Sequence, residues 1–597
     1  MTNAKTATKA RLRRALAVAP QAWALAAPYF RSERRWVAGG LLCAIVALNL
    51  AAVYMLVQIN SWNRLFYDAL QQRNATVFWQ QLGHFSWLAL AYVVIAVYRF
   101  YLTQRLQIDW RRWLTEHMLA RWLAGKAFYR LELARFQDGK EGAAAMPDNP
   151  DQRIQEDLNL FTGASVGLSM GLLNAVVTLV SFVGILWALS ASVGLPLPAL
   201  LGGPREFPGF MVWMAVLYCV AGSAITFWVG RPQMRLNYRQ QRLEADFRHR
   251  MVRVREHSEA IALDGGEGVE GRQLGGRLAD VLANYLNLVK AQKNLVWFTS
   301  FFGQAAVVFP FIIAAPRFLS GAIQLGELMQ IASAFDRVQS SLSWIVDNYA
   351  DLAAWHATTE RLGGFEASLT AQARAAGLQP EPAAELAVRN LSVALPDGRP
   401  LLQQATLSAA PGQAVLISGP SGAGKSTLLR ALAGIWPWAQ GSVQLPQDAM
   451  FIPQKPYFPD GPLRDALAYP EHPGRYSDAE LRRTLYEAQL PALCKRLDEA
   501  GAWNAQLSGG EQQRLAIARV LLKHPAWVFA DEATSALDGP TEGLLYQRLR
   551  DLVHGRGALV SVAHRDSVRQ FHGTRWRLDP QDAQIHVEPL AAVPAAA

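Results

Sequence analysis

The chain has few cysteines and few charges for its length. Only three cysteines occur among 597 residues, namely Cys43, Cys219 and Cys494. Their wide spacing excludes a disulfide framework and a cysteine-based metal site. Cys43 and Cys219 fall in apolar runs, so we expect both to be small buried hydrophobes. Charged residues make up 18% of the chain and hydrophobic residues 51%, which is apolar for a soluble protein of this size.

The positive charge is confined to one part of the sequence. The net charge is +10, but acids and bases nearly balance from Glu381 onward. The basic excess therefore lies wholly in the apolar part, where it is typical of loops that flank membrane spans. This distribution argues against nucleic acid as a partner and favours a lipid bilayer.

Long apolar runs predict membrane-spanning helices before residue 365. A span needs about 20 apolar residues. Five runs approach this length, and a weaker sixth run at 322–346 contains Glu327, Asp336 and Arg337. Charges at membrane depth are costly unless they face a bundle interior or a watery cavity. The five clear runs are 36–57, 87–101, 166–189, 210–229 and 295–315.

The segments between these runs alternate between basic and nearly uncharged. Because Lys and Arg favour the cytoplasmic side, the N-terminus, both long basic loops and the C-terminus are predicted to be cytoplasmic. That arrangement requires an even number of spans and favours six. The basic N-terminus is expected to be retained rather than cleaved as a signal peptide, because prolines precede the first long apolar run. Four polar residues of the sixth run line a pathway or make helix contacts, and the sequence does not separate these roles: Gln330, Asp336, Gln339 and Asp347.

A glycine-rich loop follows the apolar run 414–418. It matches G-x-x-x-x-G-K-[ST] between a predicted strand and a predicted helix. Glycines let backbone N–H groups cradle phosphate oxygens at a helix N-terminus, so we expect Lys425 to reach the terminal phosphates of ATP and Ser426 to coordinate Mg²⁺. A chance glycine turn is the alternative, and the strand–turn–helix setting argues against it. The predicted ATP-binding residues are Gly419, Pro420, Ser421, Gly422, Ala423, Gly424, Lys425, Ser426 and Thr427.

Two carboxylates end the apolar run 527–530. Asp531 suits the water shell of a bound metal, and Glu532 suits a general base that polarises an attacking water. Paired acids also occur as helix caps, but the phosphate loop upstream favours the catalytic interpretation.

A third motif lies about twenty residues before the acidic strand, and its residues are Leu507, Ser508, Gly509, Gly510 and Glu511. It resembles the LSGGQ signature of ATP-binding-cassette proteins, with Glu511 in place of glutamine. Gln454 is similar to the Q-loop glutamine and His564 to the switch histidine of that family. The segment that resembles the family's D-loop consists of Ser535, Ala536, Leu537 and Asp538.

The resemblance implies a mechanism and a partner. Two cassettes meet head to tail, so that each ATP lies between one phosphate loop and the other chain's signature. A second copy of the chain is the simplest partner, and a heterodimer is the alternative. The resemblance also implies catalytic roles for Glu532, His564, Gln454 and Lys425, and Mg²⁺ ligation through Ser426, Gln454 and Asp531. Leu395 stands where many relatives have an adenine-stacking aromatic ring, and Phe451 is a candidate replacement.

The membrane part carries a narrower resemblance. Residues 62–71 are similar to a segment of the SbmA/BacA family of bacterial inner-membrane peptide transporters. Residues 149–154 and 258–266 resemble segments of the peroxisomal fatty-acyl half-transporters. Within the latter, Glu259 and the Gly265–Gly266 turn are expected to contact a cassette and to couple hydrolysis to helix movement. An interfacial aromatic belt is the alternative explanation for residues 62–71.

These features predict a helical transmembrane bundle of the exporter-like type, followed by an α/β P-loop NTPase domain. The predicted parts are a cytoplasmic segment 1–35, a membrane domain 36–364, a linker 365–384 and a cassette 385–597. The expected function is ATP-driven uptake of hydrophilic peptides or other bulky polar solutes such as cobalamin, in a bacterial inner membrane. Export of lipids or fatty-acyl compounds is the first alternative. A cassette ATPase without transport is the second, and the apolar runs argue against it.

Overall fold

The computed structural model describes residues 19–134, 149–190, 194–195, 205–206, 209–374 and 377–590. The described residues of Met1–His117 and Asn149–Gly363 form one compact unit, here called the membrane unit. Those of Met118–Asp148 and Gly364–Ala597 form the other, here called the cassette unit. The first stretch of Met118–Asp148 thus belongs with the cassette although it lies far from it in sequence.

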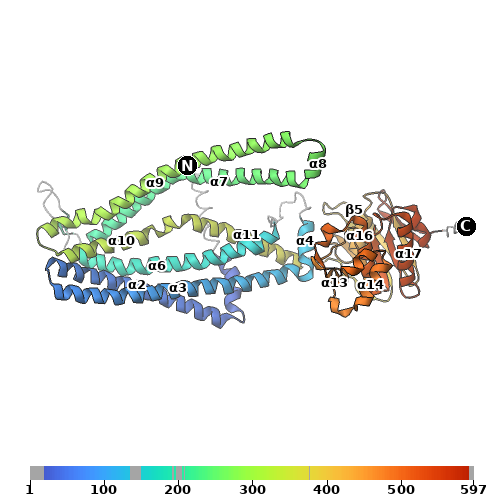
Figure 1. Cartoon of the computed structure of the whole chain (residues 1–597), viewed down its shortest axis with the longest axis horizontal. Coiled ribbons are helices and arrows are strands. Elements are labelled where there is room, and N and C mark those ends of the chain that lie inside the picture. The colour runs from blue at the N-terminus through green and yellow to red at the C-terminus, as the bar shows by residue number, and fades with distance from the viewer. Residues whose placement is uncertain are drawn as a thin grey trace. The chain divides into compact units, whose positions relative to one another are not determined.

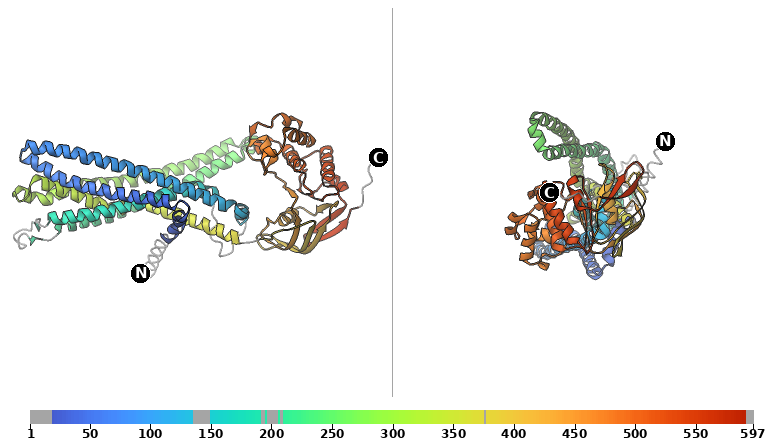
Figure 2. Two further views of the ribbon diagram at one scale, coloured as in Figure 1. Left: turned by 90° about the horizontal axis from the view of Figure 1, so that it is seen from below. Right: turned by 90° about the vertical axis from the view of Figure 1, so that its right-hand side faces the viewer.

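Long helices make up the membrane unit. After a helix over residues 19–31 come α2 (Arg35–Gln71), α3 (Ala75–Leu123), α6 (Leu158–Ser190), α7 (Phe210–Glu256), α9 (Glu267–Leu319), α10 (Leu325–Asp347) and α11 (Tyr349–Arg374). The shorter elements of this unit are α5 (Pro150–Gln152), the π-helix η2 (Arg153–Asp157), β1 (Gly194–Leu195), β2 (Arg205–Glu206) and α8 (Ser258–Leu263). The end of α3 is followed by η1 (Ala124–Lys126) and α4 (Ala127–Ala134), which belong to the cassette unit. Two of the long helices, α2 and α3, run side by side (Figure 1 and Figure 2). Cys219 is buried as expected, but Cys43 is exposed on α2, because a helix that contacts lipid keeps apolar side chains on its surface.

Among the described residues, five helical stretches are long and apolar enough to cross a membrane, and they contain the five clear apolar runs of the sequence. They are Arg35–Gln71, Ala75–Ala134, Pro150–Ser190, Phe210–Glu256 and Glu267–Leu319. The weaker sixth run forms α10, whose 23 residues rise about 34 Å. That length suffices to cross a membrane. The polar residues of α10 make it less apolar than the five stretches named above, so it is not counted among them.

One face of α10 is the centre of the membrane unit. The helix packs against α2, α6, α7 and α9, while α7 and α9 lie together and are joined through α8 (Figure 1). Gln330 is buried, and its backbone carbonyl accepts a hydrogen bond from Asn60 at 3.4 Å. Asp336 and Asp347 lie on the exposed side. The four polar residues of this run therefore divide between helix contacts and an accessible face.

The segment 62–71 has a packing role at the start of α10. Asp68 Oδ1 accepts a hydrogen bond from the Gly326 N–H at 2.9 Å, and Gln71 Oε1 accepts one from the Leu325 N–H at 2.7 Å. These side chains satisfy N–H groups that the first turn of a helix leaves free. A Cβ on Gly326 would lie 2.0 Å from the Arg64 carbonyl oxygen, so α10 approaches α2 more closely than other residues allow.

The cassette unit contains two larger sheets. The six-stranded sheet has the order β14-β13-β6-β12-β11-β8, and all neighbours are parallel except β13 and β14. The four-stranded sheet has the order β3-β7-β4-β5. The strands are β3 (Glu381–Ala383), β4 (Leu386–Ala394), β5 (Pro400–Ala409), β6 (Ala414–Ser418), β7 (Ala439–Pro446), β8 (Ala449–Ile452), β9 (Gly461–Pro462), β10 (Ala500–Gly501), β11 (Trp527–Asp531), β12 (Leu559–Val562), β13 (Thr574–Asp579) and β14 (Gln584–Pro589).

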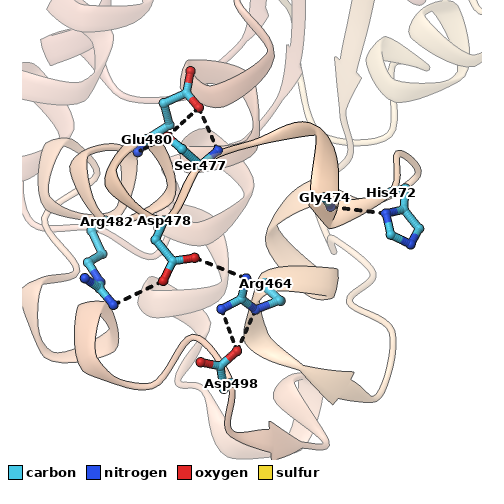
Figure 3. Close-up of polar contacts among 8 residues, drawn as sticks. All are labelled: Arg464, His472, Gly474, Ser477, Asp478, Glu480, Arg482 and Asp498. Carbon is cyan, nitrogen blue, oxygen red and sulfur yellow. Dashed lines mark hydrogen bonds and ion pairs between the residues drawn. The ribbon is translucent and has the colours of Figure 1, made fainter.

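Helices surround these sheets. They are α12 (Lys425–Leu432), α13 (Leu463–Ala468), η4 (Pro473–Arg475), α14 (Asp478–Glu487), η5 (Pro491–Lys495), α15 (Trp503–Gln506), α16 (Gly509–Lys523), α17 (Gly539–Val553) and η6 (Asp566–Phe571). Around α14, Ser477 and Glu480 form a capping box, and Arg464 bridges Asp478 and Asp498 (Figure 3). The capping box stabilises the start of α14, and the ion pairs of Arg464 connect α13 and α14 with the segment after η5, all before the signature motif.

The predicted linker 365–384 contains regular structure at both ends. Its first residues continue α11 to Arg374, and β3 occupies residues 381–383. Arg121, near the end of α3, pairs with Glu366 of α11 and donates to Thr370 Oγ1 at 3.0 Å. The C-terminal part of α11 is thus held by the C-terminal end of α3.

Candidate functional site

The phosphate loop lies between β6 and α12. Gly419, Gly422 and Gly424 have positive φ angles of 151°, 80° and 92°, a region that glycine enters at low cost. A Cβ on Gly424 would lie 3.0 Å from Leu401 Cδ1. The loop therefore turns tightly and brings its backbone to the start of α12, where N–H groups are available for an anion.

Lys425 lies across this loop. Its Nζ donates to the carbonyl oxygens of Gly419 at 3.0 Å and Pro420 at 2.9 Å, and the residue is buried. Burial lowers the pKa of Lys425, although the nearby carboxylates of Glu532 and Asp531 oppose that shift. Within the described residues, no carboxylate lies within ion-pairing distance of Nζ. A buried cation held only by carbonyl oxygens suits the phosphates of ATP.

A metal-binding pair lies beside the loop. Ser426 Oγ donates to Asp531 Oδ1 at 2.9 Å, which joins the start of α12 to the end of β11. Burial raises the pKa of Asp531, and the Ser426 hydroxyl opposes the shift. A hydroxyl and a carboxylate next to a phosphate loop fit the oxygen ligands that Mg²⁺ prefers. The predicted third ligand, Gln454, bonds to Glu532 instead in this structure.

Glu532 is held between two predicted catalytic partners. Gln454 Nε2 donates to its carboxylate at 2.7 Å, and His564 Nε2 lies 3.1 Å from the other carboxylate oxygen. The φ angle of Glu532 is +49°, which costs free energy for a residue other than glycine. Gln454, Glu532 and His564 follow the carboxyl ends of the parallel strands β8, β11 and β12. Ligands bind at this edge of such sheets.

The signature turn caps its own helix. Ser508 is the N-cap of α16, and its N–H and Oγ donate to Glu511 Oε2 at 2.9 Å and 2.7 Å. The Glu511 N–H donates back to Ser508 Oγ at 3.4 Å. The Ser508 hydrogen bonds lower the pKa of Glu511, so this carboxylate is charged at neutral pH. No hydrogen bond or ion pair that the structure describes joins the signature turn to the phosphate loop of the same chain.

Two residues that were not predicted from the sequence hold the D-loop, Gln513 from the signature helix and Arg565 from beside the switch histidine. Gln513 Nε2 donates to the Glu532 carbonyl at 3.2 Å and to Ser535 Oγ at 2.9 Å, while its Oε1 accepts from the Ala536 N–H at 2.9 Å. Arg565 donates to the carbonyls of Leu537 and Ser535. Gln513 follows the signature by two residues and Arg565 follows the switch histidine, so their position beside motifs was the available signal.

The first long loop contributes α4 to the cassette. Leu133 is buried in the core between the sheets, with Tyr129 packed against it. Tyr129 also lines a cavity of about 360 Å³ together with Ser426, Gln454 and Asp531. The turns of both long helical stretches are expected to touch another domain, but specific contact residues are predicted only in the second loop. The apolar residues of 127–134, which interrupt a basic stretch, were the overlooked signal.

The second long loop forms α8 and the Gly265–Gly266 turn. Glu259 and Gly265 are exposed, and Gly265 has φ +62°. All described residues of α8 are exposed except Ile261, which is half-buried. This segment is therefore accessible to a partner, in contrast to α4.

Phe451 lies beside the predicted nucleotide site. It stacks on Phe529 with 4.5 Å between ring centroids, and it lines the cavity of about 360 Å³ that Ser426 also borders. Leu395 packs against the core between the sheets. Phe451 therefore stays the candidate for stacking on adenine.

These geometries identify the class of protein, and comparison with known families agrees. Residues 25–319 match the model of ABC transporter transmembrane region 2, and residues 402–535 match that of the ABC transporter ATP-binding domain. The chain belongs to the ABC transporter family. It is an ATPase whose ATP hydrolysis, with Mg²⁺, is coupled to transport.

Several known proteins are similar to this chain over most of its length. An ABC transporter ATP-binding protein of Synechocystis is 35% identical, with 94% of this chain and 85% of that protein covered. The inner membrane ABC transporter ATP-binding protein YddA of Escherichia coli is 33% identical, with 88% and 92% covered. The lysosomal cobalamin transporter ABCD4 of Homo sapiens is 29% identical, with 79% and 82% covered.

The fold is similar to that of a bacterial Atm1-family ABC exporter with ATP bound. The TM-score is 0.67 at 20% identity, with 93% of this chain and 95% of that chain covered. This match supports the predicted exporter-like arrangement of a helical membrane domain followed by an ATPase domain.

Proposed function

We propose that the protein takes up hydrophilic peptides or other bulky polar solutes, including cobalamin-like compounds, at the expense of ATP. The observation that carries this proposal is the exposed polar face of α10, which includes Asp336, Arg337, Ser340 and Asp347. Charged side chains at membrane depth require a watery route rather than lipid. A polar route favours polar cargo over the lipid or fatty-acyl cargo of the alternative. The similarity to a lysosomal cobalamin transporter agrees with this choice.

In this proposal α10 is the sixth span of a bacterial inner-membrane protein whose N-terminus and cassette are cytoplasmic. Its length of about 34 Å matches the hydrocarbon thickness. A buried face packed among four other helices compensates for its low hydropathy. The similar YddA protein is named as an inner membrane protein, which supports an inner-membrane location for this chain.

The functional form is a homodimer, with a heterodimer as the alternative. Lys425 belongs to the phosphate loop and Ser508 to the signature turn. In the described residues these two turns make no contact with each other, so one chain does not bring both of them to the same ATP. Two copies arranged head to tail would place each phosphate loop against the other copy's signature. Glu532 then acts as the general base, His564 and Gln454 orient its carboxylate, and Ser426 and Asp531 hold Mg²⁺. The bound nucleotide supplies the phosphoanhydride bond whose hydrolysis drives transport.

Glu259 and the Gly265–Gly266 turn couple hydrolysis to helix movement by contacting the cassette of the second copy. Exposure of α8 supports this role. Each cassette has a cavity of about 560 Å³ that is lined by Tyr457 and by both basic and acidic side chains. Its bases Arg475 and Lys523 are available to the acidic turn, and Asp448 and Glu471 also border the cavity. Disulfide cross-linking of Glu259→Cys with Tyr457→Cys, in a background lacking the native cysteines, is expected to join two chains. Cross-links that form only within monomers contradict the assignment.

Uptake of a fluorescent antimicrobial peptide by cells tests the proposed transport. Cells with the wild-type protein are expected to accumulate the peptide, and cells with Glu532→Gln at equal expression are not. Equal accumulation in both excludes ATP-driven import. Release of preloaded peptide only by the wild-type protein favours export.

A further inference from the structure

The membrane unit contains a cavity between α7, α9 and the junction of α10 with α11. Its volume is about 340 Å³. The wall contributed by α7 carries polar, uncharged side chains spaced by three, seven and four residues, which places them on one face of the helix. These residues are Ser223, Thr226, Gln233 and Asn237.

The opposite face of α7 differs in character. Leu217, Val220 and Trp228 are 60%, 61% and 73% exposed, as expected of side chains that contact lipid. The polar stripe therefore points away from the lipid-facing side of the same helix. The rest of the lining is largely apolar and consists of Phe227, Gly230, Met234, Leu295, Ile345, Val346, Tyr349 and Ala350, apart from Asp347. The cavity therefore offers a polar stripe for hydrogen bonds and apolar walls for the stem of an amphipathic side chain.

Asp347 supplies the negative charge of the cavity. It is the last residue of α10 and belongs to the lining. Among the described contacts it has no hydrogen bond or ion pair, and no lysine or arginine belongs to the lining that the structure describes. Arg231, on the same part of α7, lies over the Phe227 ring at 5.3 Å instead. A carboxylate among neutral polar groups, without a cation of its own, is a site that a cationic ligand completes.

We propose that this cavity binds a cationic group of the transported solute, an ammonium or guanidinium, with Asp347 as the ion-pairing residue. The proposal rests on the proposed uptake of polar solutes and specifies which of them are preferred. Gln233 and Asn237 offer carbonyl oxygens to the remaining N–H donors of such a group. The aromatic ring of Tyr349, also in the lining, adds a surface that favours cations over anions. Acyl carboxylates and phosphates are repelled by the same carboxylate.

Binding of matched peptides to the full-length protein in lipid nanodiscs tests the site. The probes are a fluorescein-labelled octapeptide with two lysines and the same peptide with both lysines acetylated. The wild-type protein is expected to bind the lysine peptide about tenfold more tightly, the effect of one partly desolvated ion pair. Asp347→Asn is expected to abolish this preference, and Asp347→Glu to keep it. Asp351→Asn, which removes a carboxylate of α11 outside the cavity lining, is the matched control and should keep it as well.

Charge reversal keeps the test informative if Asp347→Asn folds poorly. Asp347→Lys is expected to prefer the octapeptide with succinylated lysines over the unmodified one. An unchanged preference for the lysine peptide in Asp347→Asn or Asp347→Lys would overturn the proposal. ATP-dependent uptake that does not distinguish lysine from acetyl-lysine also contradicts this site, although it supports the proposed function. Charge-selective binding without ATP-dependent uptake would support this site and contradict the proposed function.

Discussion

The two anion-binding turns of the cassette differ in what already occupies them. In the phosphate loop, Lys425 is held only by the carbonyls of Gly419 and Pro420, and the loop glycines leave its backbone open. In the signature turn, the carboxylate of Glu511 already accepts hydrogen bonds from Ser508. One turn is therefore prepared for an anion, whereas the other contains an anion of its own. This difference implies that the phosphate loop supplies most of the ATP affinity and that the signature turn responds to ATP held by a partner.

The largest effect is expected from the residues around the phosphate loop. Glu532→Gln removes the proposed general base, a contribution of about 100-fold to 10,000-fold in rate. Lys425→Ala removes the cation that faces the phosphates and should abolish hydrolysis to a similar extent. Phosphate release by the purified protein in nanodiscs measures both. Glu487→Gln, at the half-buried last residue of α14, is the control and should hydrolyse ATP normally. Near-normal turnover in either site variant refutes the role assigned to that residue.

Gln513→Ala tests whether the signature helix controls the catalytic carboxylate. This change removes three hydrogen bonds and leaves the Ala536 N–H without its partner, which costs about 1–3 kcal/mol. Turnover is expected to fall by about tenfold or more while half-saturating ATP changes little, because the phosphate loop is untouched. Gln547→Ala, at an exposed position of α17, should behave like the wild-type protein in turnover. A loss confined to ATP affinity would contradict this assignment.

A smaller effect with the opposite sign is expected from Glu511→Gln. The substitution keeps an oxygen that caps α16 but removes the negative charge where the partner's ATP arrives. Half-saturating ATP is therefore expected to fall by roughly threefold to tenfold. Because Ser508 lowers the pKa of Glu511, this advantage should persist throughout the neutral pH range.

Glu511→Ala separates charge from capping. It removes both, so the cap loss should lower the free energy of unfolding by about 1 kcal/mol while ATP affinity rises. If Glu511→Gln matches the wild-type protein in half-saturating ATP, the carboxylate serves only as a cap and the contrast between the two turns disappears.

The positions of the residues proposed as catalytic were predictable from sequence because each lies in a contiguous motif. The phosphate loop, Asp531 and Glu532 follow strands whose ends meet at one edge of a parallel sheet, so local patterns suffice. Gln513 and Arg565 were missed because their roles depend on side-chain contacts with the D-loop that no spacing reveals.

The helices of the membrane unit were predictable from sequence where the helix is apolar on all sides. Five spans follow from hydropathy alone, but α10 does not, because it is apolar on one face and polar on the other. The role of Asp68 and Gln71 as caps of α10 depends on contacts across more than 250 positions. Likewise, Leu133 of the first loop packs in the cassette core although over 250 residues separate it from most of that core. Contacts over such distances follow from tertiary structure, which local sequence patterns do not contain.

Mixing two inactive variants tests most directly whether two chains complete each other's ATP sites. Lys425→Ala inactivates the phosphate loop, and Ser508→Arg blocks the signature turn. When the two are co-reconstituted, a mixed dimer contains one site built from the intact phosphate loop of one chain and the intact signature of the other. ATP hydrolysis is therefore expected to recover in the mixture while each variant alone remains inactive. Activity in the mixture no greater than the sum of the separate variants would contradict the head-to-tail arrangement.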